Sequence, residues 1–145
     1  MKNFAIFLGF VLLCSSVAFA VDEQQLNYEH LWLGQWCTGW TSGDSEQMGY
    51  PIQLNFTLNK DGIITGDDVH DSITTNYYDI KVDRDKMNGS WKQLGTDFEG
   101  VFNITLKYDE KKNKIFDGTW KDTKRPYGHG AYRGKKLTEG ETCKK

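Results

Sequence analysis

The sequence has little of what marks several large protein classes. Its 145 residues contain two prolines and three cysteines, and the formal net charge is −2. This balance does not favour a nucleic acid as the partner. The G-x-S-x-G elbow, the P-loop and the HExxH motif are all absent, which removes the usual signatures of serine hydrolases, nucleotide-binding proteins and zinc proteases. No cysteine sits in a C-x-x-C pair or near paired histidines, so no redox or zinc motif is indicated. A chain of this length without low-complexity tracts predicts one globular domain.

A long apolar run occurs once, at the N-terminus. Met1-Lys2-Asn3 precedes an apolar segment from Phe4 to Leu13, and Ala18-Phe19-Ala20 follows. A charged start, an apolar segment and a small-residue site are typical of a secretory signal. The segment is shorter than the roughly 20 residues that span a bilayer, so we expect no membrane insertion. The sequence therefore predicts a signal peptide over residues 1–20 and one secreted domain over residues 21–145.

The cysteines support an extracellular destination. Removal of the signal would remove Cys14 and leave Cys37 and Cys143, which in an oxidising compartment normally form a disulfide. Two free thiols are the alternative, and they would suit a cytosolic protein. The predicted disulfide closes a loop that covers nearly the whole domain, and such a loop contributes about 4–5 kcal/mol in the chain-entropy model.

Most of the predicted domain has the pattern of β-strands. In Ile52 to Leu58 the apolar residues occupy every second position, and Asn59-Lys60-Asp61-Gly62 then provides a turn. A short helical or turn-like lead-in covers Asp22 to Leu31. Similar alternating segments separated by turn residues predict about eight strands joined as an antiparallel meander. The expected strands cover residues 33–41, 52–58, 63–66, 76–82, 86–93, 98–108, 115–121 and 128–137.

A recurrent triplet indicates how this sheet closes. Glycine and a large aromatic residue stand two apart in Gly34-Gln35-Trp36, Gly89-Ser90-Trp91, Gly118-Thr119-Trp120 and Gly130-Ala131-Tyr132. This spacing places both residues on the same face of a strand. The glycine lets the strand bend and makes room for a neighbouring ring, as a tightly curved sheet requires. We therefore predict an all-β fold, an up-and-down meander of about eight strands closed into a small barrel, in preference to an open sandwich.

Three glycosylation sequons agree with the predicted strand faces. They begin at Asn55, Asn88 and Asn103, and each asparagine alternates with residues that are expected to face inward. An attached glycan must face solvent, so all three sites are predicted on the outer face. Cys37 follows inward Trp36 and is also expected to point outward, where the tail ending at Cys143 could lie across the first strand.

The lead-in and the first strand resemble the entrance of a lipocalin. Leu26-Asn27-Tyr28-Glu29-His30-Leu31-Trp32 precedes Leu33-Gly34-Gln35-Trp36, and in lipocalins a short helical turn comes before a G-x-W strand whose Trp plugs the barrel floor. Residues 26–137 are thus similar to the calycin group of secreted ligand-binding barrels, which includes lipocalins and avidins. The chain has no T-D-Y motif of the lipocalin type at the expected place. The resemblance implies that Arg133 could cap the floor Trp.

The same resemblance implies non-covalent binding of a small ligand in the barrel mouth, without a cofactor. The expected ligand is a small hydrophobic or aromatic molecule or a sugar, because aromatic walls bury apolar area and stack on rings. The alternative is a solid barrel, since eight strands are only just wide enough for their own side chains. The candidate lining residues are Trp36, Trp40, Tyr78, Trp91, Phe102, Trp120 and Tyr132.

Two further functions remain open at the level of sequence. A secreted interaction module or inhibitor would use a filled barrel and bind a protein partner through the basic C-terminal third, at Lys121 to Tyr127 and Arg133 to Lys136. A small extracellular enzyme would use Asp67, Asp68, His70 and Asp71, whose carboxylates and imidazole could hold a divalent metal or act as base and acid. These four residues are expected in a loop at the barrel rim.

Overall fold

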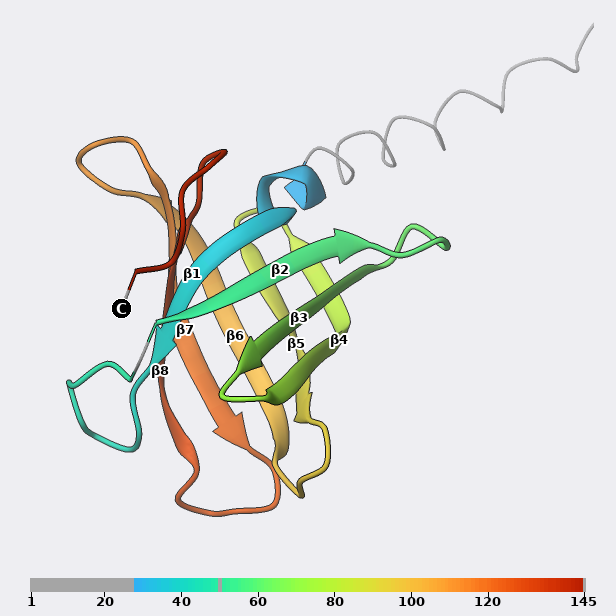
Figure 1. Ribbon diagram of the computed structural model, residues 1–145, viewed down its shortest axis with the longest axis vertical. Helices are drawn as coiled ribbons and strands as arrows, with labels where there is room; N and C mark the ends of the chain where they lie inside the picture. Colours follow the sequence, from blue (N-terminus) through green and yellow to red (C-terminus); the bar gives the residue numbers. More distant parts are fainter. Residues whose placement is uncertain (1–27, 50, 145) are drawn as a thin grey trace, which may run out of the picture.

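The computed structural model describes residues 28–49 and 51–144, and the predicted signal peptide lies outside this range. A helical turn over residues 28–32 precedes eight antiparallel strands that form a closed barrel (Figure 1). Each strand pairs with the next, and β1 also pairs with β8. The predicted meander and its closure are confirmed. The strands are β1 (Gly34–Trp40), β2 (Ile52–Leu58), β3 (Ile64–His70), β4 (Ile73–Asp83), β5 (Lys86–Gln93), β6 (Glu99–Tyr108), β7 (Lys114–Asp122) and β8 (His129–Lys136).

Alternation along the strands separates the core from the solvent. In β2 the side chains of Ile52, Leu54 and Phe56 are buried, whereas those of Gln53 and Thr57 are exposed. Successive side chains of a strand point to opposite faces, so one face of every strand contributes to a shared interior. The aromatic rings of all four glycine triplets belong to this core or pack against it.

Close approach explains why some strand positions are glycine. A Cβ atom on Gly89 would lie 2.9 Å from Cε1 of Phe102. A Cβ atom on Gly134 would overlap the ring of Phe116. Glycine thus makes room for a ring of the neighbouring strand, as the triplets predicted for Gly89, while Gly134 lies outside the triplets.

The third strand is longer than the sequence predicted. β3 continues to His70 and β4 begins at Ile73, so Asp67, Asp68 and His70 belong to a strand and not to a rim loop. The two strands are joined by Asp71 and Ser72, with φ values of 46° and 68°. Two residues with positive φ form the tight turn that suits the twist of a hairpin. Because neither residue is glycine, this turn was not predicted from the sequence.

A β-bulge divides β4 into two halves with opposite inward residues. The pairing of β4 with β5 shifts register between Tyr78 and Lys81, and Asp79 between them has a φ of 51°. Before the bulge Tyr77 is buried, and after it Val82 is buried. A bulge adds one residue to one strand, which exchanges the two faces. Tyr78 is consequently 38% exposed, and its prediction as a lining residue is wrong.

The helical turn closes one end of the barrel, which we call the floor. The rings of Trp32, Trp36 and Phe116 pack together with centroid distances of 5.3–6.3 Å. The indole N–H of Trp36 donates a hydrogen bond to the carbonyl oxygen of Trp32 at 2.7 Å. All three rings are at most 1% exposed, so the floor is solid.

A lysine takes the place that was expected for an arginine beside the floor Trp. Lys136 Nζ lies 5.7 Å from the centroid of the Trp36 ring and donates to the carbonyl oxygen of Leu31 at 3.0 Å. Burial lowers the pKa of Lys136. Arg133 is exposed and its Nε lies 3.1 Å from Asp117 Oδ1. The expectation for Arg133 is therefore wrong, because its position in β8 faces outward.

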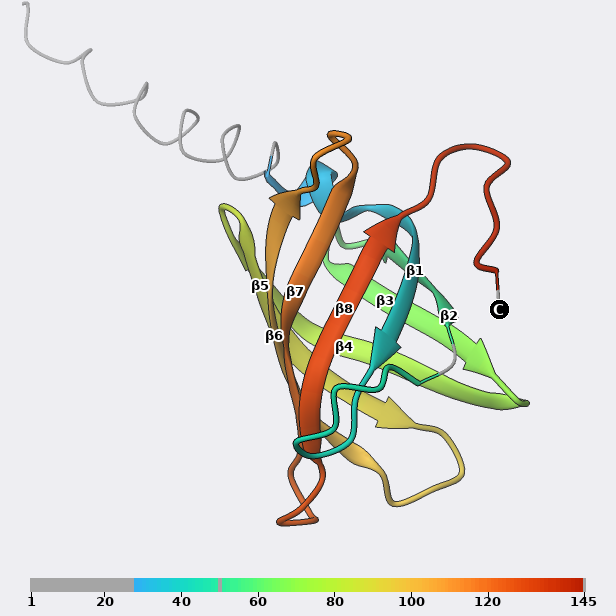
Figure 2. The same ribbon diagram turned by 90° about the vertical axis from the view of Figure 1, so that its left-hand side faces the viewer.

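A disulfide joins the C-terminal tail to the first strand. Cys37 and Cys143 are bonded across a sequence separation of 106 residues, with their Cα atoms 5.0 Å apart. Figure 2 shows the chain after β8 looping out and returning along the side of the barrel. The predicted pairing is confirmed, and it secures the tail near the seam between β1 and β8.

Candidate ligand-binding site

A cavity of about 250 Å³ lies at the end of the barrel opposite the floor, which we call the mouth. It is surrounded by residues near the ends of β1, β5 and β7 and near the starts of β4, β6 and β8. Most of its wall is aromatic, and three polar side chains complete it. The lining residues are Trp40, Ser42, Thr75, Tyr77, Trp91, Gln93, Phe98, Phe102, Trp120 and Tyr132.

Five of the seven residues expected to line a cavity are found in its wall. These are Trp40, Trp91, Phe102, Trp120 and Tyr132. Trp36 lies in the floor, and Tyr78 is on the outer surface because of the bulge. Its neighbour Tyr77 takes the inward position and lines the cavity. The alternation in Thr75-Asn76-Tyr77 was the only sequence signal for this residue, and Phe98, which precedes its strand, gave none.

Ring contacts fix the aromatic wall. Trp91 and Trp120 meet edge to face at 6.0 Å, and Phe102 makes edge contacts with Tyr77 at 5.7 Å and with Tyr132 at 6.5 Å. Edge-to-face geometry is favourable for aromatic pairs. The indole N–H of Trp120 also donates to the carbonyl oxygen of Thr41 at 2.8 Å. The wall is therefore held in place before any ligand enters.

A hydrogen-bonded chain runs along one side of the cavity to a buried carboxylate. The Tyr132 hydroxyl donates to the Tyr77 oxygen at 3.2 Å, and the Tyr77 hydroxyl donates to Asp68 Oδ2 at 2.7 Å. Asp68 is 2% exposed, and its Oδ1 has no hydrogen-bond partner. Burial raises the pKa of Asp68, although the hydrogen bond from Tyr77 acts to lower it. Burial likewise raises the pKa values of Tyr77 and Tyr132, so both hydroxyls stay protonated.

One donor in the cavity wall also lacks a partner. The indole nitrogen of Trp91 is buried and forms no hydrogen bond. A third such atom, the indole nitrogen of Trp32, belongs to the floor and lies away from the cavity. Buried polar groups without partners are rare in folded proteins. Asp68 and Trp91 thus supply an unused acceptor and an unused donor beside the same aromatic cavity.

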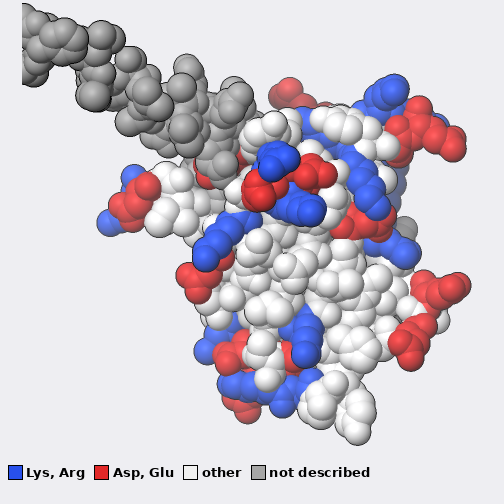
Figure 3. Space-filling model, turned by 180° about the vertical axis from the view of Figure 1, so that it is seen from behind, with Lys and Arg blue, Asp and Glu red and all other residues white. Residues whose placement is uncertain are grey.

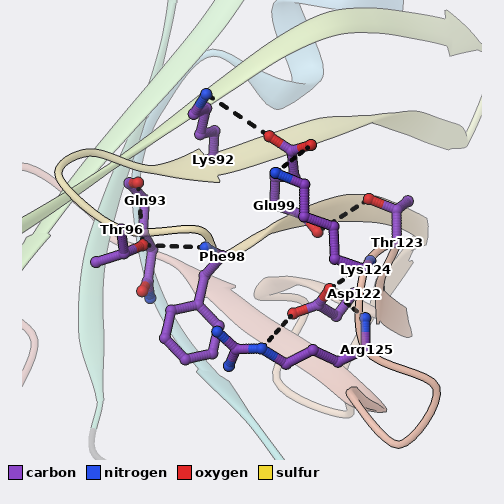
Figure 4. Close-up of polar contacts among 9 residues, drawn as sticks. All are labelled: Lys92, Gln93, Thr96, Phe98, Glu99, Asp122, Thr123, Lys124 and Arg125. Atoms are coloured by element: carbon purple, nitrogen blue, oxygen red, sulfur yellow. Dashed lines mark hydrogen bonds and ion pairs between the residues drawn. The ribbon is translucent and has the colours of Figure 1, made fainter.

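Two loops are tied together at the rim of the mouth (Figure 4). Glu99 at the start of β6 lies 3.6 Å from Lys92 and 3.2 Å from Lys124. The guanidinium of Arg125 stacks 3.2 Å above the ring of Phe98. Asp122, which is buried, accepts hydrogen bonds from the backbone N–H groups of Lys124 and Arg125 at 2.7 and 3.0 Å. These contacts hold the Phe98 ring in the cavity wall.

The structure separates the residues of the predicted enzyme site. Asp67 is exposed and Asp68 is buried, because neighbouring residues of β3 face opposite sides. His70 Nε2 lies 3.1 Å from Asp71 Oδ2 in the exposed turn. Within the part of the chain that the structure describes, no group of three or more His, Cys, Asp or Glu side chains is placed to hold a metal ion. The four residues therefore do not converge on one point.

The three sequon asparagines lie in strands on the outer face of the barrel. Asn88 and Asn103 are exposed and Asn55 is half-buried. Asn88 in β5 stands directly opposite Asn103 in β6. On its other side Asn88 stands opposite the exposed Lys81 of β4. Figure 3 shows a stretch without charged side chains in the middle of the face seen from behind Figure 1. The neighbouring outward residues are Ser90, Val101, Thr119 and Ala131.

Much of the positive charge in the C-terminal third is paired. Lys107 and Arg133 both contact Asp117, and Lys135 contacts Glu141. Lys124 and Arg125 contact the carboxylates of the rim, as described above. The stretches expected to form a basic contact surface are thus interspersed with acids.

The chain matches no protein-family model, and neither a curated protein nor a solved structure shows significant similarity to it. No helix within residues 28–49 and 51–144 has the length and apolar character needed to cross a membrane. The function of the chain is therefore inferred from the geometry of the site.

Proposed function

We propose that this protein is a secreted, non-catalytic barrel of the calycin type that binds a small ligand in its mouth. The observation that carries the proposal is the aromatic cavity of about 250 Å³ at one end of a barrel whose other end is solid. A filled barrel would have packed its mouth as tightly as its floor. The cavity instead has rings around an open space.

The size and the wall of the cavity limit the ligand. Ligand pockets usually measure about 300–1,000 Å³, so a cavity of about 250 Å³ suits a small molecule. Aromatic rings bury apolar area and stack on flat rings or on sugars. Because ring contacts and the Trp120 hydrogen bond already fix the wall, binding would order few side chains and lose little entropy.

Secretion and calycin-type ancestry are part of the same proposal. The Cys37–Cys143 disulfide suits an oxidising compartment, as does the signal-like pattern of the first 20 residues. The buried Trp36 beneath the helical turn, with Lys136 beside its ring, supports the calycin-type floor.

The proposal is tested by ligand screening on the full secreted protein. Native mass spectrometry first reports any molecule that co-purifies with the chain. Tryptophan emission and calorimetry then follow titration with small substituted benzenes, indoles and monosaccharides. We expect at least one class to bind with one-to-one stoichiometry and to change the emission of Trp91 and Trp120, which line the cavity.

A matched pair of loop variants separates cavity binding from surface binding. Ser42 is exposed and lines the mouth, whereas Ser45 is exposed in the same loop and does not line it. Ser42→Trp should weaken binding at least about tenfold by obstructing the mouth, and Ser45→Trp should leave it unchanged. Absence of a co-purified ligand together with no saturable binding in the panel would refute the proposal.

The alternative functions have less support. An interaction module that uses the basic C-terminal third is weakened because Lys124, Arg125 and Arg133 each face a carboxylate. An enzyme that uses the Asp67–Asp71 segment is weakened because the strand places Asp67 and Asp68 on opposite faces.

A further inference from the structure

The polar side of the cavity, at Tyr77, Tyr132 and Thr75, offers mainly acceptors. The Tyr132 hydroxyl donates its hydrogen bond to Tyr77, and the Tyr77 hydroxyl donates its hydrogen bond to Asp68. Each hydroxyl oxygen keeps a free lone pair, and Asp68 Oδ1 has no hydrogen bond. Both tyrosine protons are used inside the chain, and the Thr75 hydroxyl, the other donor on this side, acts on Asp68. This side of the cavity therefore offers mainly acceptors and suits a ligand that brings its own donors.

Asp68 is buried without a permanent cation. Besides Tyr77, the titratable side chains that act on it are His70, which is half-buried, and Asp67, which is another carboxylate. No lysine or arginine of the described ranges is among them. A buried carboxylate without a countercharge is costly. Thr75 lies opposite Asp68 in the sheet, and both Thr75 and Tyr77 line the cavity, so Asp68 stands directly behind these two lining residues.

We propose that the ligand is a small primary amine with an aromatic or apolar body, whose ammonium group binds at the Asp68–Tyr77–Thr75 side of the mouth cavity. This inference rests on the proposed ligand-binding function and specifies that the ligand is positively charged. An ammonium group brings three donors and one positive charge, which match the free lone pairs and the carboxylate. The body of the ligand packs among the rings of Trp91, Trp120 and Phe102.

The rest of the mouth favours a cation as well. Aromatic faces attract ammonium groups, and Trp is the strongest in this respect. The loops at the mouth carry four acidic side chains, and their two cations, Lys124 and Arg125, are already in contact with Glu99 and Asp122. Negative loops at a cleft raise the local concentration of positive ligands. The four acids are Asp44, Glu46, Asp71 and Asp97.

Three probes of nearly equal shape test this assignment on the full secreted chain. Phenethylamine is a cation, 2-phenylethanol is neutral and 3-phenylpropionate is an anion at neutral pH. We expect calorimetry and tryptophan emission to show the amine binding at least about tenfold more tightly than the alcohol, with the carboxylate weakest. This comparison uses the wild-type protein and needs no variant.

A matched pair of aspartate variants then locates the charge. Asp68→Asn keeps the size of the side chain and an acceptor for Tyr77, and should reduce the preference for the amine over the alcohol to within about twofold. Asp67→Asn removes an exposed carboxylate of the same strand and should retain the wild-type preference. Circular dichroism checks that both variants are folded.

The outcomes separate this inference from the function on which it rests. If the alcohol or the carboxylate binds as tightly as the amine, the assignment of an amine fails and ligand binding stands. If Asp68→Asn keeps the full preference, or Asp67→Asn removes it, the placement at Asp68 fails. If none of the three probes binds but a neutral panel compound does, the amine is again rejected. If nothing binds, both proposals fail.

Discussion

The two ends of the barrel are built from similar residues and differ in what fills them. At the floor, Trp32, Trp36 and Phe116 are buried and in mutual contact. At the mouth, Trp91 and Trp120 meet edge to face beside a cavity of about 250 Å³. The helical turn supplies Trp32 as a plug for the floor, whereas the loops at the mouth are tied to each other along the rim. The strand pattern thus sets the barrel, and the connecting segments decide which end is open.

The largest effect is expected from the covalent link at the seam between the first and last strands. Replacing Cys37 and Cys143 by Ser should lower the free energy of unfolding by about 4–5 kcal/mol, because the bridge closes a loop of roughly 100 residues in the unfolded chain. Urea unfolding of the variant, compared with wild type with and without reductant, measures the change. A loss below about 1 kcal/mol would show that the seam holds without the bridge.

The next prediction compares one tryptophan from each end. Trp36→Ala should cost about 4 kcal/mol, because it leaves a void in a packed floor and removes a hydrogen bond. Trp40→Ala, at the half-buried edge of the mouth, should cost about 1 kcal/mol. Chemical unfolding of both variants gives the difference. Equal costs would mean that the mouth is packed as tightly as the floor.

Two glycine-to-alanine variants compare how well the floor and the mouth tolerate an added methyl group. Gly134→Ala places a methyl group into the ring of Phe116 at the floor, and Gly89→Ala places one against Phe102, which borders the cavity. Because Phe102 has space to move into, we expect about 2–3 kcal/mol for Gly134→Ala and about 1 kcal/mol for Gly89→Ala. The reverse order in thermal or urea unfolding would contradict an empty mouth.

The smallest effect concerns the dependence of stability on pH. Burial raises the pKa of Asp68 above its ordinary value of 3.8, so the folded protein binds this proton more tightly than the unfolded chain. The resulting stability is present at low pH and is lost as the pH rises from 3.8 through the raised pKa. Asp68→Asn should remove this decline, and Asp67→Asn should keep it. Urea midpoints measured between about pH 3 and pH 7 provide the test, and an Asp68→Asn profile identical to that of the wild type would contradict the prediction.

The sequence predicted the barrel because its signals are local. Two of these signals lie within single strands: the alternation in segments such as Ile52 to Leu58, and the glycines that stand two residues from an aromatic residue. The disulfide was predicted by elimination, because only one cysteine pair remains after removal of the signal. The faces of β4 were not predictable in the same way. The bulge at Asp79 depends on pairing with β5, so alternation along the strand alone could not show that Tyr77, and not the predicted Tyr78, faces inward.

The site was predicted less completely for the same reason. Phe98 enters the cavity wall through its contact with Arg125, which comes from a different loop. The carboxylate of Asp68 becomes notable only when Tyr77 and Tyr132 are seen beside it. Lys136 holds the position beside Trp36 that was expected for Arg133. Each of these depends on contacts between segments that are distant in the chain.

The position of Asn88 opposite Asn103 has a steric consequence for carbohydrate attachment. Side chains that face each other across two strands have Cβ atoms about 5 Å apart, which is less than the width of one branched oligosaccharide. Two sugar chains attached at this pair would therefore crowd each other once the barrel has folded. A single sugar chain there would lie beside Val101 and Thr119 and would keep other molecules away from these uncharged side chains.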